Sequence, residues 1–458
     1  MQSHHHFVTR DPKSLLLRFP HHPHRYHFHK RPSKMLGSNM AAPVIGPDSS
    51  AASLPAVRPV GPLHHSSMST ASTASTSSDL SFVPETVKEE DLAHSPISLK
   101  AKHYKHETFA AKLLDIIHTI SVPTWAYPSI TPQSIDVFKV SGSLTNAVFF
   151  ISCPSVPDAH TLLLRIYGAS SGELISRPRE LHTLHMLSSR YHIGPLVYGT
   201  FANGRVEEYF ESTTLSAADL RDPQISRWIG ARMAELHSVD IDVVEDGAEW
   251  EIAASANVLA LPAILKVVRQ EIDIDAFETD WRRYMGWLAT IDDQKDGNRR
   301  VFAHNDTQYG NLLRLKTISP NVPEHRQIIV VDFEYAAPNP AAFDIANHFH
   351  EWTADYHGPT PHLLDPERYP TPEQRRNMYA AYAEHAGVRS AGESWLATLE
   401  EQVRAWSPAS HAMWAIWGLV QAREDIESAV EEPEFDYINY ARCRMEGFRR
   451  EVRALGIL

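Results

Sequence analysis

The residues between 135 and 210 have the pattern of short strands, whereas most of the chain beyond them has the pattern of helices. Runs of β-branched and aromatic residues, separated by turn-forming residues, predict strands at 135–140, 146–153 and 161–168. A hairpin is expected at 197–210, with Asn203-Gly204 supplying the positive φ angles of its turn. Helical spacing of apolar residues predicts helices at 177–192, 216–238, 256–272, 274–290, 372–386, 393–405 and 409–430. This order predicts an α+β fold in which a β-rich lobe precedes a mostly helical lobe, with a cleft between them.

The first hundred residues lack the pattern of a folded segment. Eight histidines fall within residues 1–30, and Pro- and Ser-rich sequence follows, including a Ser/Thr tract at 66–79. Such a composition cannot bury enough apolar surface to offset the entropy that ordering would cost. We therefore expect a disordered low-complexity extension over residues 1–100, in which the histidines are incidental rather than a metal site.

Composition excludes several classes of protein. No run approaches the ~18 consecutive apolar residues that a membrane-spanning helix needs. Cys153 and Cys443 are the only cysteines among 458 residues, which excludes a disulfide framework and a thiolate zinc site and favours a cytoplasmic location. Residues 1–65 hold eight Lys or Arg against two acidic residues, which leaves a net charge of −19 on residues 66–458. So acidic a folded part is unsuited to binding nucleic acid.

The most informative stretch is VFAHNDTQYGNLLRL at 301–315, which contains the pattern H-x-D-x-x-x-x-N as His304, Asp306 and Asn311. A later apolar run, IIVV, ends in Asp332. Phosphoryl transfer needs a carboxylate that faces the acceptor hydroxyl, which Asp306 fits, and hard oxygen ligands for Mg²⁺, which Asn311 and Asp332 supply. Either motif alone is equally consistent with an ordinary polar loop or strand end. Their order and spacing together favour a kinase-type site.

The nucleotide is then expected in the β-rich half, which has neither a G-x-x-x-x-G-K-[ST] loop nor a G-x-G-x-x-G loop. The turn between the first two strands is rich in hydroxyl and amide side chains, and its backbone N–H groups are suited to cover phosphates. Its candidate residues are Ser141, Gly142, Ser143, Thr145 and Asn146. Arg165 interrupts an apolar strand and needs anionic partners, which phosphate oxygens and Glu180 of the next helix would supply. A purely structural Arg165–Glu180 ion pair is the alternative.

At these residues the sequence resembles the choline/ethanolamine kinase family, from about residue 120 to residue 458. The resemblance rests on the motifs VSGSLTNAVFF, LLLRIYG, FAHNDTQYGNLL, IIVVDFEYAAPNPAAFDIANHFHEW and SHAMWAIWGLVQA. The fourth, at 328–352, is highly specific, because protein kinases and aminoglycoside phosphotransferases share only its Asp and the upstream H-x-D-x-x-x-x-N. The loop SGSLTN departs from the family pattern, since many relatives have a second Gly there.

The resemblance implies a two-lobe protein-kinase-like fold and ATP-dependent phosphorylation of a small amino alcohol. By position it implies that Asp306 is the catalytic base, that Asn311 and Asp332 hold Mg²⁺, and that Arg165 contacts the nucleotide phosphates, with Gln308 in a supporting role there. The domains expected are the extension at 1–100, a nucleotide-binding lobe at 101–212, and a helical lobe with the catalytic and acceptor sites at 213–458. His304, His348 and His350 are expected to brace the structure rather than to move protons.

The acceptor site is expected in the helical lobe. A quaternary ammonium cannot donate hydrogen bonds, so aromatic faces and diffuse negative charge must hold it. The candidate acceptor residues are Tyr335, Glu351, Tyr356, Trp414, Trp417 and Tyr440. Pattern alone favours core packing for Trp414 and Trp417, which lie three residues apart on one helix face. The resemblance implies instead that Tyr356, Trp414, Trp417 and Tyr440 form the family's choline pocket and that Glu351 is its acidic wall.

The expected function is direct, in-line phosphorylation of choline to phosphocholine, the first step of CDP-choline phospholipid synthesis, with ATP and Mg²⁺ as cofactors and ethanolamine as a further acceptor. The alternatives are an ethanolamine-selective kinase, an aminoglycoside-type phosphotransferase and a non-catalytic pseudokinase scaffold. Intact Asp306, Asn311 and Asp332 disfavour the pseudokinase. Acceptor preference and oligomeric state stay open, a homodimer being one alternative.

Overall fold

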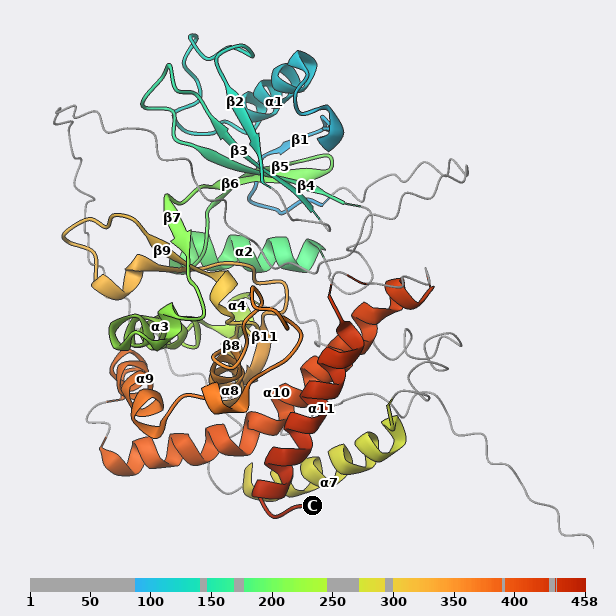
Figure 1. Cartoon of the computed structure of the whole chain (residues 1–458). Coiled ribbons are helices and arrows are strands. Elements are labelled where there is room, and N and C mark those ends of the chain that lie inside the picture. The colour runs from blue at the N-terminus through green and yellow to red at the C-terminus, as the bar shows by residue number, and fades with distance from the viewer. Residues whose placement is uncertain are drawn as a thin grey trace, which may run out of the picture.

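The chain forms two lobes. The computed structural model describes residues 87–140, 146–168, 177–244, 272–292, 300–388, 392–427, 433 and 435–458. Figure 1 shows a sheet with one helix across it in the upper lobe, and a larger, mostly helical lower lobe. The two-lobe α+β fold predicted from the sequence is confirmed.

The upper lobe is built on a six-stranded sheet with the order β1-β5-β6-β4-β3-β2. Its strands are β1 (His94–Ser95), β2 (Asp136–Lys139), β3 (Asn146–Ser152), β4 (Leu162–Tyr167), β5 (Val197–Phe201) and β6 (Gly204–Glu208). All neighbours pair antiparallel except β1 and β5, which are parallel. The helix α1 (Glu107–Thr119) shares one apolar core with the sheet, in which Leu113, Ile116, Phe149 and Leu164 are fully buried. The three strands predicted first are confirmed.

The predicted hairpin is present as β5 and β6, but its turn differs from the expectation. Phe201 pairs with Gly204, so Ala202 and Asn203 form the loop, and neither Asn203 nor Gly204 has a positive φ. The glycine serves a close approach of two strands instead. A Cβ at Gly204 would lie 2.2 Å from the carbonyl oxygen of Arg165 on β4, so a larger residue there would force the strands apart.

The upper lobe begins before residue 100, so the predicted domain boundary is too late. Val87 and Leu99 are buried, and β1 adds a strand beside β5. The side chain of Asn203 holds this segment in place, because its Oδ1 accepts from the Leu99 N–H at 3.0 Å and its Nδ2 donates to the Leu99 carbonyl at 2.8 Å. The prediction averaged the composition over the first hundred residues, so the few apolar side chains near residue 100 did not affect it. Residues 1–86 lie outside the described residues.

The lower lobe is mostly helical, and α2 (Arg177–Tyr191) lies between it and the sheet (Figure 1). Its helices are α3 (Pro223–Leu236), α4 (Ile241–Val244), α7 (Ile274–Asp292), α8 (Ala341–Glu351), α9 (Pro372–His385), α10 (Glu393–Glu427) and α11 (Tyr437–Ala454). Short 3-10 turns are η2 (Ala101–His103), η3 (Asp219–Arg221), η4 (Tyr309–Asn311), η5 (Glu324–Gln327) and η6 (Pro366–Arg368). The helices predicted at 177–192, 274–290 and 372–386 are confirmed. The helix predicted at 256–272 falls on residues 245–271, which the structure does not describe.

The helix α3 begins later than the predicted start at residue 216. Asp222 is its N-cap and accepts hydrogen bonds from the backbone N–H groups of Gln224 and Ile225, at 2.8 and 3.0 Å. Pro223 occupies the first helical position, where its missing N–H costs nothing. The preceding residues form the separate turn η3, so apolar spacing alone placed the start too early.

Two helices predicted at 393–405 and 409–430 are one continuous helix, α10, with Pro408 inside it. The expected break was wrong, although a proline removes one helical hydrogen bond and crowds the preceding turn. The phenolic hydroxyl of Tyr284 donates to the carbonyl oxygen of Ala405 at 2.6 Å, beside the proline. Ala409 and Ala412 are completely buried, so tertiary packing on this face holds the helix together through the proline.

Two small sheets lie in the lower lobe, and β7 and β9 of one of them lie just below the upper lobe in Figure 1. One has the order β10-β9-β7 and contains β7 (Ser212–Thr214), β9 (Leu312–Leu315) and β10 (Ile328–Val330). The other pairs β8 (Arg300–Ala303) with β11 (Ala337–Pro340). The segments that carry Asp306 and Asp332 both leave these sheets, so the pairing of the strands sets their relative positions.

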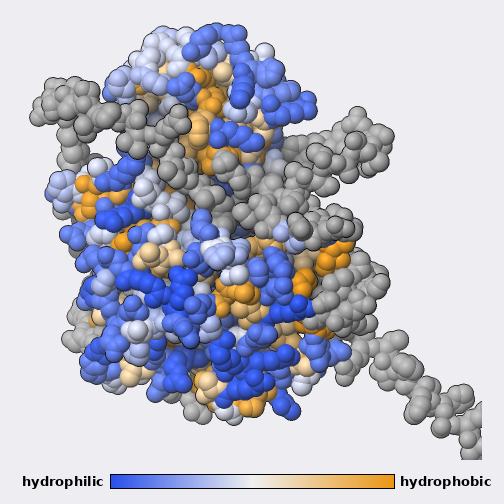
Figure 2. Space-filling view, in the orientation of Figure 1, coloured by the Kyte–Doolittle hydropathy of each residue, from blue (hydrophilic) through white to orange (hydrophobic). Residues whose placement is uncertain are grey.

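The helices of the lower lobe turn their apolar sides inward, and Figure 2 shows hydrophilic residues over most of this lobe on the face drawn, broken by small hydrophobic areas. None of the helices among the described residues is long and apolar enough to cross a bilayer.

Candidate active site

The segment that carries Asp306 follows β8 and is anchored by Asp344 of α8. The Asp344 carboxylate accepts from the backbone N–H groups of His304 at 2.9 Å and Asn305 at 2.8 Å, and it contacts Nε2 of His237 at 2.9 Å. Burial alone would raise the pKa of Asp344, but the hydrogen bond with His237 and the neighbouring charges outweigh it and lower the pKa below 3.8. Asp344 is therefore an ionised anchor in the lobe's interior.

Asn305, the residue before Asp306, has a left-handed backbone with φ of 62°. Asparagine tolerates this conformation better than most residues, and hydrogen bonds hold it here. Its Nδ2 donates to the carbonyl of Tyr335 at 2.9 Å, its Oδ1 accepts from Asn339 Nδ2 at 3.0 Å, and its carbonyl accepts from Asn347 Nδ2 at 3.0 Å. This bonding fixes the sharp turn that positions Asp306.

Two histidines brace the same segment, as expected. His304 donates from Nε2 to the carbonyl of Val331 at 3.1 Å, and its Nδ1 accepts from the Asp306 N–H at 3.3 Å. Nδ1 of His348 lies 2.8 Å from the carbonyl oxygen of Thr307, to which it donates. Burial lowers the pKa of both rings, that of His348 to about 4, so both are neutral near pH 7. His304 thus ties the Asp306 segment to the residue that precedes Asp332.

Asp306, Asn311 and Asp332 lie together. Nδ2 of Asn311 donates to Oδ2 of Asp306 at 2.8 Å and to the Asp306 carbonyl at 3.0 Å. The carbonyl of Asn311 accepts from the N–H of Val331 at 3.0 Å, which places Asp332 next to this pair. The backbone of Asp332 is also left-handed, with φ of 68°.

Negative charge accumulates where these residues meet. Burial raises the pKa of Asp306 well above its usual value, and the nearby carboxylates of Glu351 and Asp332 raise it further. Glu334 behaves similarly, because burial and then Asp332 raise its pKa. A divalent cation held by Asn311 and Asp332 would relieve this repulsion, and the donor atoms on offer are the hard oxygens that Mg²⁺ prefers. The residues present therefore fit a magnesium site.

The nucleotide side differs from the expected Arg165–Glu180 pair. Arg165 contacts Glu207 at 3.2 Å, whereas Glu180 pairs with Arg205 at 2.6 Å, and Arg205 also contacts Glu207 at 2.6 Å. The two arginines lie directly opposite each other on β4 and β6, so both glutamates are needed to balance them. Burial alone would lower the pKa of Arg165, but Glu207 and other nearby carboxylates, Asp332 among them, raise it above its usual value.

The remaining nucleotide candidates are only partly described. Ser141, Gly142, Ser143 and Thr145 fall outside the described residues, and Asn146 is the first residue of β3. Gln308 is buried and precedes the turn η4. A Cβ at Gly310 would lie 3.0 Å from Oε1 of Gln308, so the glycine leaves room for the Gln308 side chain.

Four of the six predicted acceptor residues form one chain of ring contacts. Tyr335 meets Trp414, Trp414 meets Trp417, and Trp417 meets Tyr440, edge to face, with centroids 5.6, 5.2 and 5.9 Å apart. Trp417 donates from its indole N–H to the Tyr335 hydroxyl at 2.9 Å. Burial raises the pKa of Tyr335 and of Tyr440, and the negative charge of Asp306 is among the further causes for both. The carbonyl of Tyr335 also accepts from Nδ2 of Asn305 at 2.9 Å, so the ring cluster lies beside the segment that carries Asp306.

The other two, Glu351 and Tyr356, join the cluster through a buried arginine. Glu351 accepts from Tyr356 Oη at 2.7 Å through Oε2, and from Arg444 at 3.0 Å through Oε1. Arg444 also donates to the Tyr440 hydroxyl at 3.1 Å and lies over its ring. Glu351 and Arg444 are both almost fully buried. Glu351 therefore lies within this cluster, and Arg444 compensates its charge.

Several residues that shape the site were missed at the sequence level. They are Asn305, Asp344, Arg205, Glu207, Glu334 and Arg444. Glu334 stood in the motif beside Asp332 and could have been inferred as a third acidic group. The others act through partners far away in the chain, for which local spacing gives no signal.

A β-rich lobe above a helical lobe, with the Asp306 segment between them, defines a kinase-like small-molecule phosphotransferase fold. A sequence model of the family described as choline/ethanolamine kinase matches residues 137–449. The chain belongs to the choline/ethanolamine kinase family, as the resemblance predicted.

The relatives agree with this membership. A choline kinase of Schizosaccharomyces pombe is 36% identical over 413 residues, which cover 76% of this chain and 90% of the relative. A human choline/ethanolamine kinase is 30% identical over a region that covers 70% of this chain and 81% of the human protein. The solved choline kinase of Cryptosporidium parvum Iowa II superposes with a TM-score of 0.58 at 23% identity, over 76% of this chain and 97% of that one. The structural likeness supports the two-lobe fold.

Proposed function

We propose that this protein transfers the γ-phosphoryl group of ATP to the hydroxyl of choline, forming phosphocholine and ADP. The observation that carries the proposal is the position of Asp306, which contacts Asn311 at 2.8 Å and follows Asn305, whose side chain donates to the carbonyl of Tyr335 at 2.9 Å. A carboxylate near both a set of oxygen ligands and a set of aromatic rings is suited to join a phosphate donor to a cationic alcohol. Family membership supports the same reaction.

The reaction needs one proton acceptor and in-line positioning. The choline oxygen attacks the γ-phosphorus, the bond from that phosphorus to the β–γ bridging oxygen breaks, and the hydroxyl proton passes to Asp306. Asn311 and Asp332 would hold Mg²⁺, which neutralises charge on the β- and γ-phosphates when bound. Asp344 and Asn305 hold Asp306 in place without touching substrate.

The nucleotide contacts belong to the same proposal. Arg165 would contact the phosphates, since Glu207 uses only part of its guanidinium and Asp332 lies nearby. The backbone N–H groups of Ser141, Gly142, Ser143, Thr145 and Asn146 would bind the same phosphates. Gln308 would support the phosphate or the metal. Glu180 would act through Arg205, by keeping the two opposed arginines balanced.

The acceptor cluster favours choline over ethanolamine. Both oxygens of Glu351 already accept hydrogen bonds, from Arg444 and Tyr356, and Arg444 balances its charge. Much of the attraction that Glu351 could offer a primary ammonium is therefore already used, whereas a quaternary ammonium needs only ring faces such as those of Trp417 and Tyr440. A site with one compensated carboxylate also gives little support to an aminoglycoside acceptor, which carries several ammonium groups.

The test is a measurement of ADP release from the purified protein with choline, ethanolamine, and the mono- and dimethylated intermediates as acceptors. We expect kcat/KM to rise with each added methyl group. Tyr356→Phe keeps the ring but frees one oxygen of Glu351, so we expect it to raise the ethanolamine-to-choline ratio of kcat/KM a few-fold. Arg453→Met, an exposed residue of α11, is the control and should leave the ratio unchanged. Equal kcat/KM for all four acceptors would refute the acceptor assignment.

A cytoplasmic location and a homodimer complete the proposal. Fluorescent tagging in cells addresses the first. Light scattering on the purified chain addresses the second, for which a mass of about 103 kDa is expected from two chains of 51.6 kDa.

A further inference from the structure

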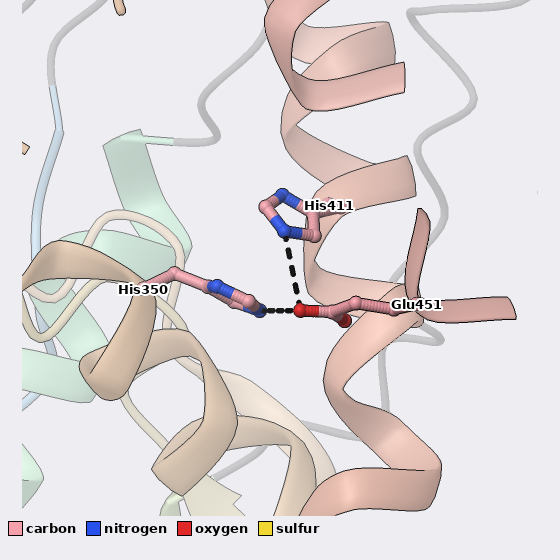
Figure 3. Close-up of side chains that lie close together, drawn as sticks. All are labelled: His350, His411 and Glu451. Carbon is pink, nitrogen blue, oxygen red and sulfur yellow. Dashed lines mark ion pairs between the residues drawn. The ribbon is translucent and has the colours of Figure 1, made fainter. Parts of the chain in front are cut away.

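A second group of possible ligands lies in the lower lobe, outside the catalytic site. His350 of α8, His411 of α10 and Glu451 of α11 point toward one another from three helices (Figure 3). Nε2 of His411 lies 3.5 Å and Nε2 of His350 lies 3.9 Å from the same Oε1 of Glu451. One ligand atom from each of the three side chains can be chosen so that all lie within 4.8 Å of one another.

His411 and Glu451 keep unsatisfied polar atoms, whereas His350 is partnered by Ser407. Neither ring nitrogen of His411, which is 2% exposed, has a hydrogen-bond partner among the described residues, and neither has Oε2 of Glu451. Separations of 3.5 and 3.9 Å are too long for hydrogen bonds within the group. An unpartnered imidazole in the interior is costly, so a native protein normally supplies a partner. An ion held by Glu451 and by Nε2 of both histidines would give His411 the partner that it lacks.

Helix α11 packs closely against the ring of His411. The approach occurs at Gly447, where a Cβ would lie 2.6 Å from the ring. The rings of His350 and His411 lie 3.9 Å apart between centroids. Burial lowers the pKa of both histidines well below 6.5, so both rings are in the neutral form that binds metals.

A pocket borders this group at Glu451. The pocket, of about 190 Å³ between α9, α10 and α11, is lined by Ser407 and Glu451, among other residues. The hydroxyl of Ser407 lies 2.9 Å from Nε2 of His350. Either Ser407 or a water molecule beside Glu451 is therefore placed to complete a four-ligand set.

We propose that His350, His411 and Glu451 form a Zn²⁺ site that clips α8, α10 and α11 together. Two imidazoles and one carboxylate suit zinc rather than Mg²⁺ or Ca²⁺, which prefer all-oxygen sets. A tetrahedral set with bonds of about 2.0 Å places its ligand atoms roughly 3.3 Å apart, so binding draws the three side chains slightly inward. The same three helices carry Glu351, Trp414 and Tyr440, so the ion would stabilise the scaffold of the acceptor cluster from a neighbouring position.

The test measures zinc binding by the full chain, stripped with a chelator and titrated with ZnCl₂. We expect the wild type to retain one more equivalent of zinc after dialysis than Glu451→Gln or His411→Gln, and its affinity at this site to exceed theirs about tenfold or more. Zinc should also raise the Tm of the stripped wild type and not that of the two variants. The N-terminal histidines are the same in every protein, so the difference between variants isolates this site. Glu446→Gln, an exposed residue of α11, is the matched control and should behave as the wild type.

The outcomes separate cleanly. CoCl₂ in place of zinc should give the visible absorption of a four-coordinate ion in the wild type only. Because His411→Gln alters a buried residue and could fail to fold, the partly exposed Glu451→Gln decides. Equal zinc content and equal Tm response in wild type and Glu451→Gln would overturn the proposal.

Discussion

The side-chain amide of Asn311 donates to Oδ2 of Asp306 at 2.8 Å, so the base and one metal ligand of the proposed mechanism are in direct contact. The bond leaves the carbonyl oxygen of the Asn311 amide as its ligand atom, and it holds the Asp306 carboxylate in one rotamer. A substitution that removes the charge of Asp306 but keeps the shape of its side chain should therefore leave the geometry of the site intact.

Asp306→Asn keeps the shape of the side chain but removes the proton acceptor. We expect kcat to fall about 10³-fold or more, while ATP binding measured by calorimetry stays within about twofold of the wild type. Asp242→Asn, an exposed residue of α4, is the control. Retention of a tenth of the wild-type kcat would remove Asp306 from its role.

Asp332 is expected to govern the metal requirement. A chelator should abolish turnover, and added Mg²⁺ should restore it. Asp332→Asn should raise the Mg²⁺ concentration for half-maximal activity at least about tenfold, because an amide is a weaker ligand than a carboxylate. Asp355→Asn, half-buried in the loop after α8, should leave that concentration unchanged. An unchanged requirement in Asp332→Asn would contradict the assignment.

Trp417 should matter for choline and not for ATP. Trp417→Ala removes a ring face and should raise the KM for choline about tenfold, with the KM for ATP within about twofold. Trp417→Phe keeps a ring face but loses the hydrogen bond to Tyr335, so a smaller effect is expected. If both KM values rise equally in Trp417→Ala, the residue serves core packing instead.

The ion cluster of the upper lobe predicts a pH-dependent stability. Burial alone would raise the pKa of Glu207, but Arg205 and Arg165 outweigh it and hold the pKa below 4.5. The stabilisation is therefore complete above pH 4.5 and is lost as the pH falls from there through the lower folded-state value. Glu207→Gln should lower the free energy of unfolding by about 3 kcal/mol at pH 7, because it leaves buried arginines uncompensated.

Urea unfolding at pH 7 and at pH 4 checks this prediction. The deficit of Glu207→Gln should shrink at the lower pH, where the Glu207 carboxylate of the unfolded wild type takes up a proton before that of the folded protein does. Glu211→Gln disrupts only an exposed pair with Lys316 and should cost less than about 1 kcal/mol at either pH. A deficit that is independent of pH would show that packing, not charge, sets the effect.

The sequence predicted well what depends on neighbours in the chain. Alternating and helical patterns located the strands β2 to β6 and the helices α2, α7 and α9, but they did not locate α1, α8 or α11. The motifs around Asp306 and Asp332 were informative because the proposed catalytic residues sit there at short, fixed spacings. It predicted poorly what depends on long-range pairing. Arg165 was matched with Glu180, on the next helix, whereas its contact is Glu207, 42 residues on and brought close by the pairing of β4 with β6.

The acceptor side shows the same limit. Glu351 was recognised, but its partner Arg444 lies 93 residues away, and nothing in the spacing of α11 marks that arginine as buried. The helix break predicted near Pro408 was wrong for a related reason. The hydroxyl of Tyr284, which supports α10 there, comes from a helix that is distant in the sequence. Tertiary contacts override local preference in each case.

The short strand β1 and the hydrogen bonds between Asn203 and Leu99 affect how the protein tolerates an N-terminal truncation. The family match starts at residue 137, so a truncated variant could be designed to begin there. Such a deletion would expose one edge of β5, whose backbone groups could then pair with a strand of another molecule, and it would remove α1 from the apolar face of the sheet. Aggregation of a shortened protein would then report an exposed sheet rather than a damaged catalyst.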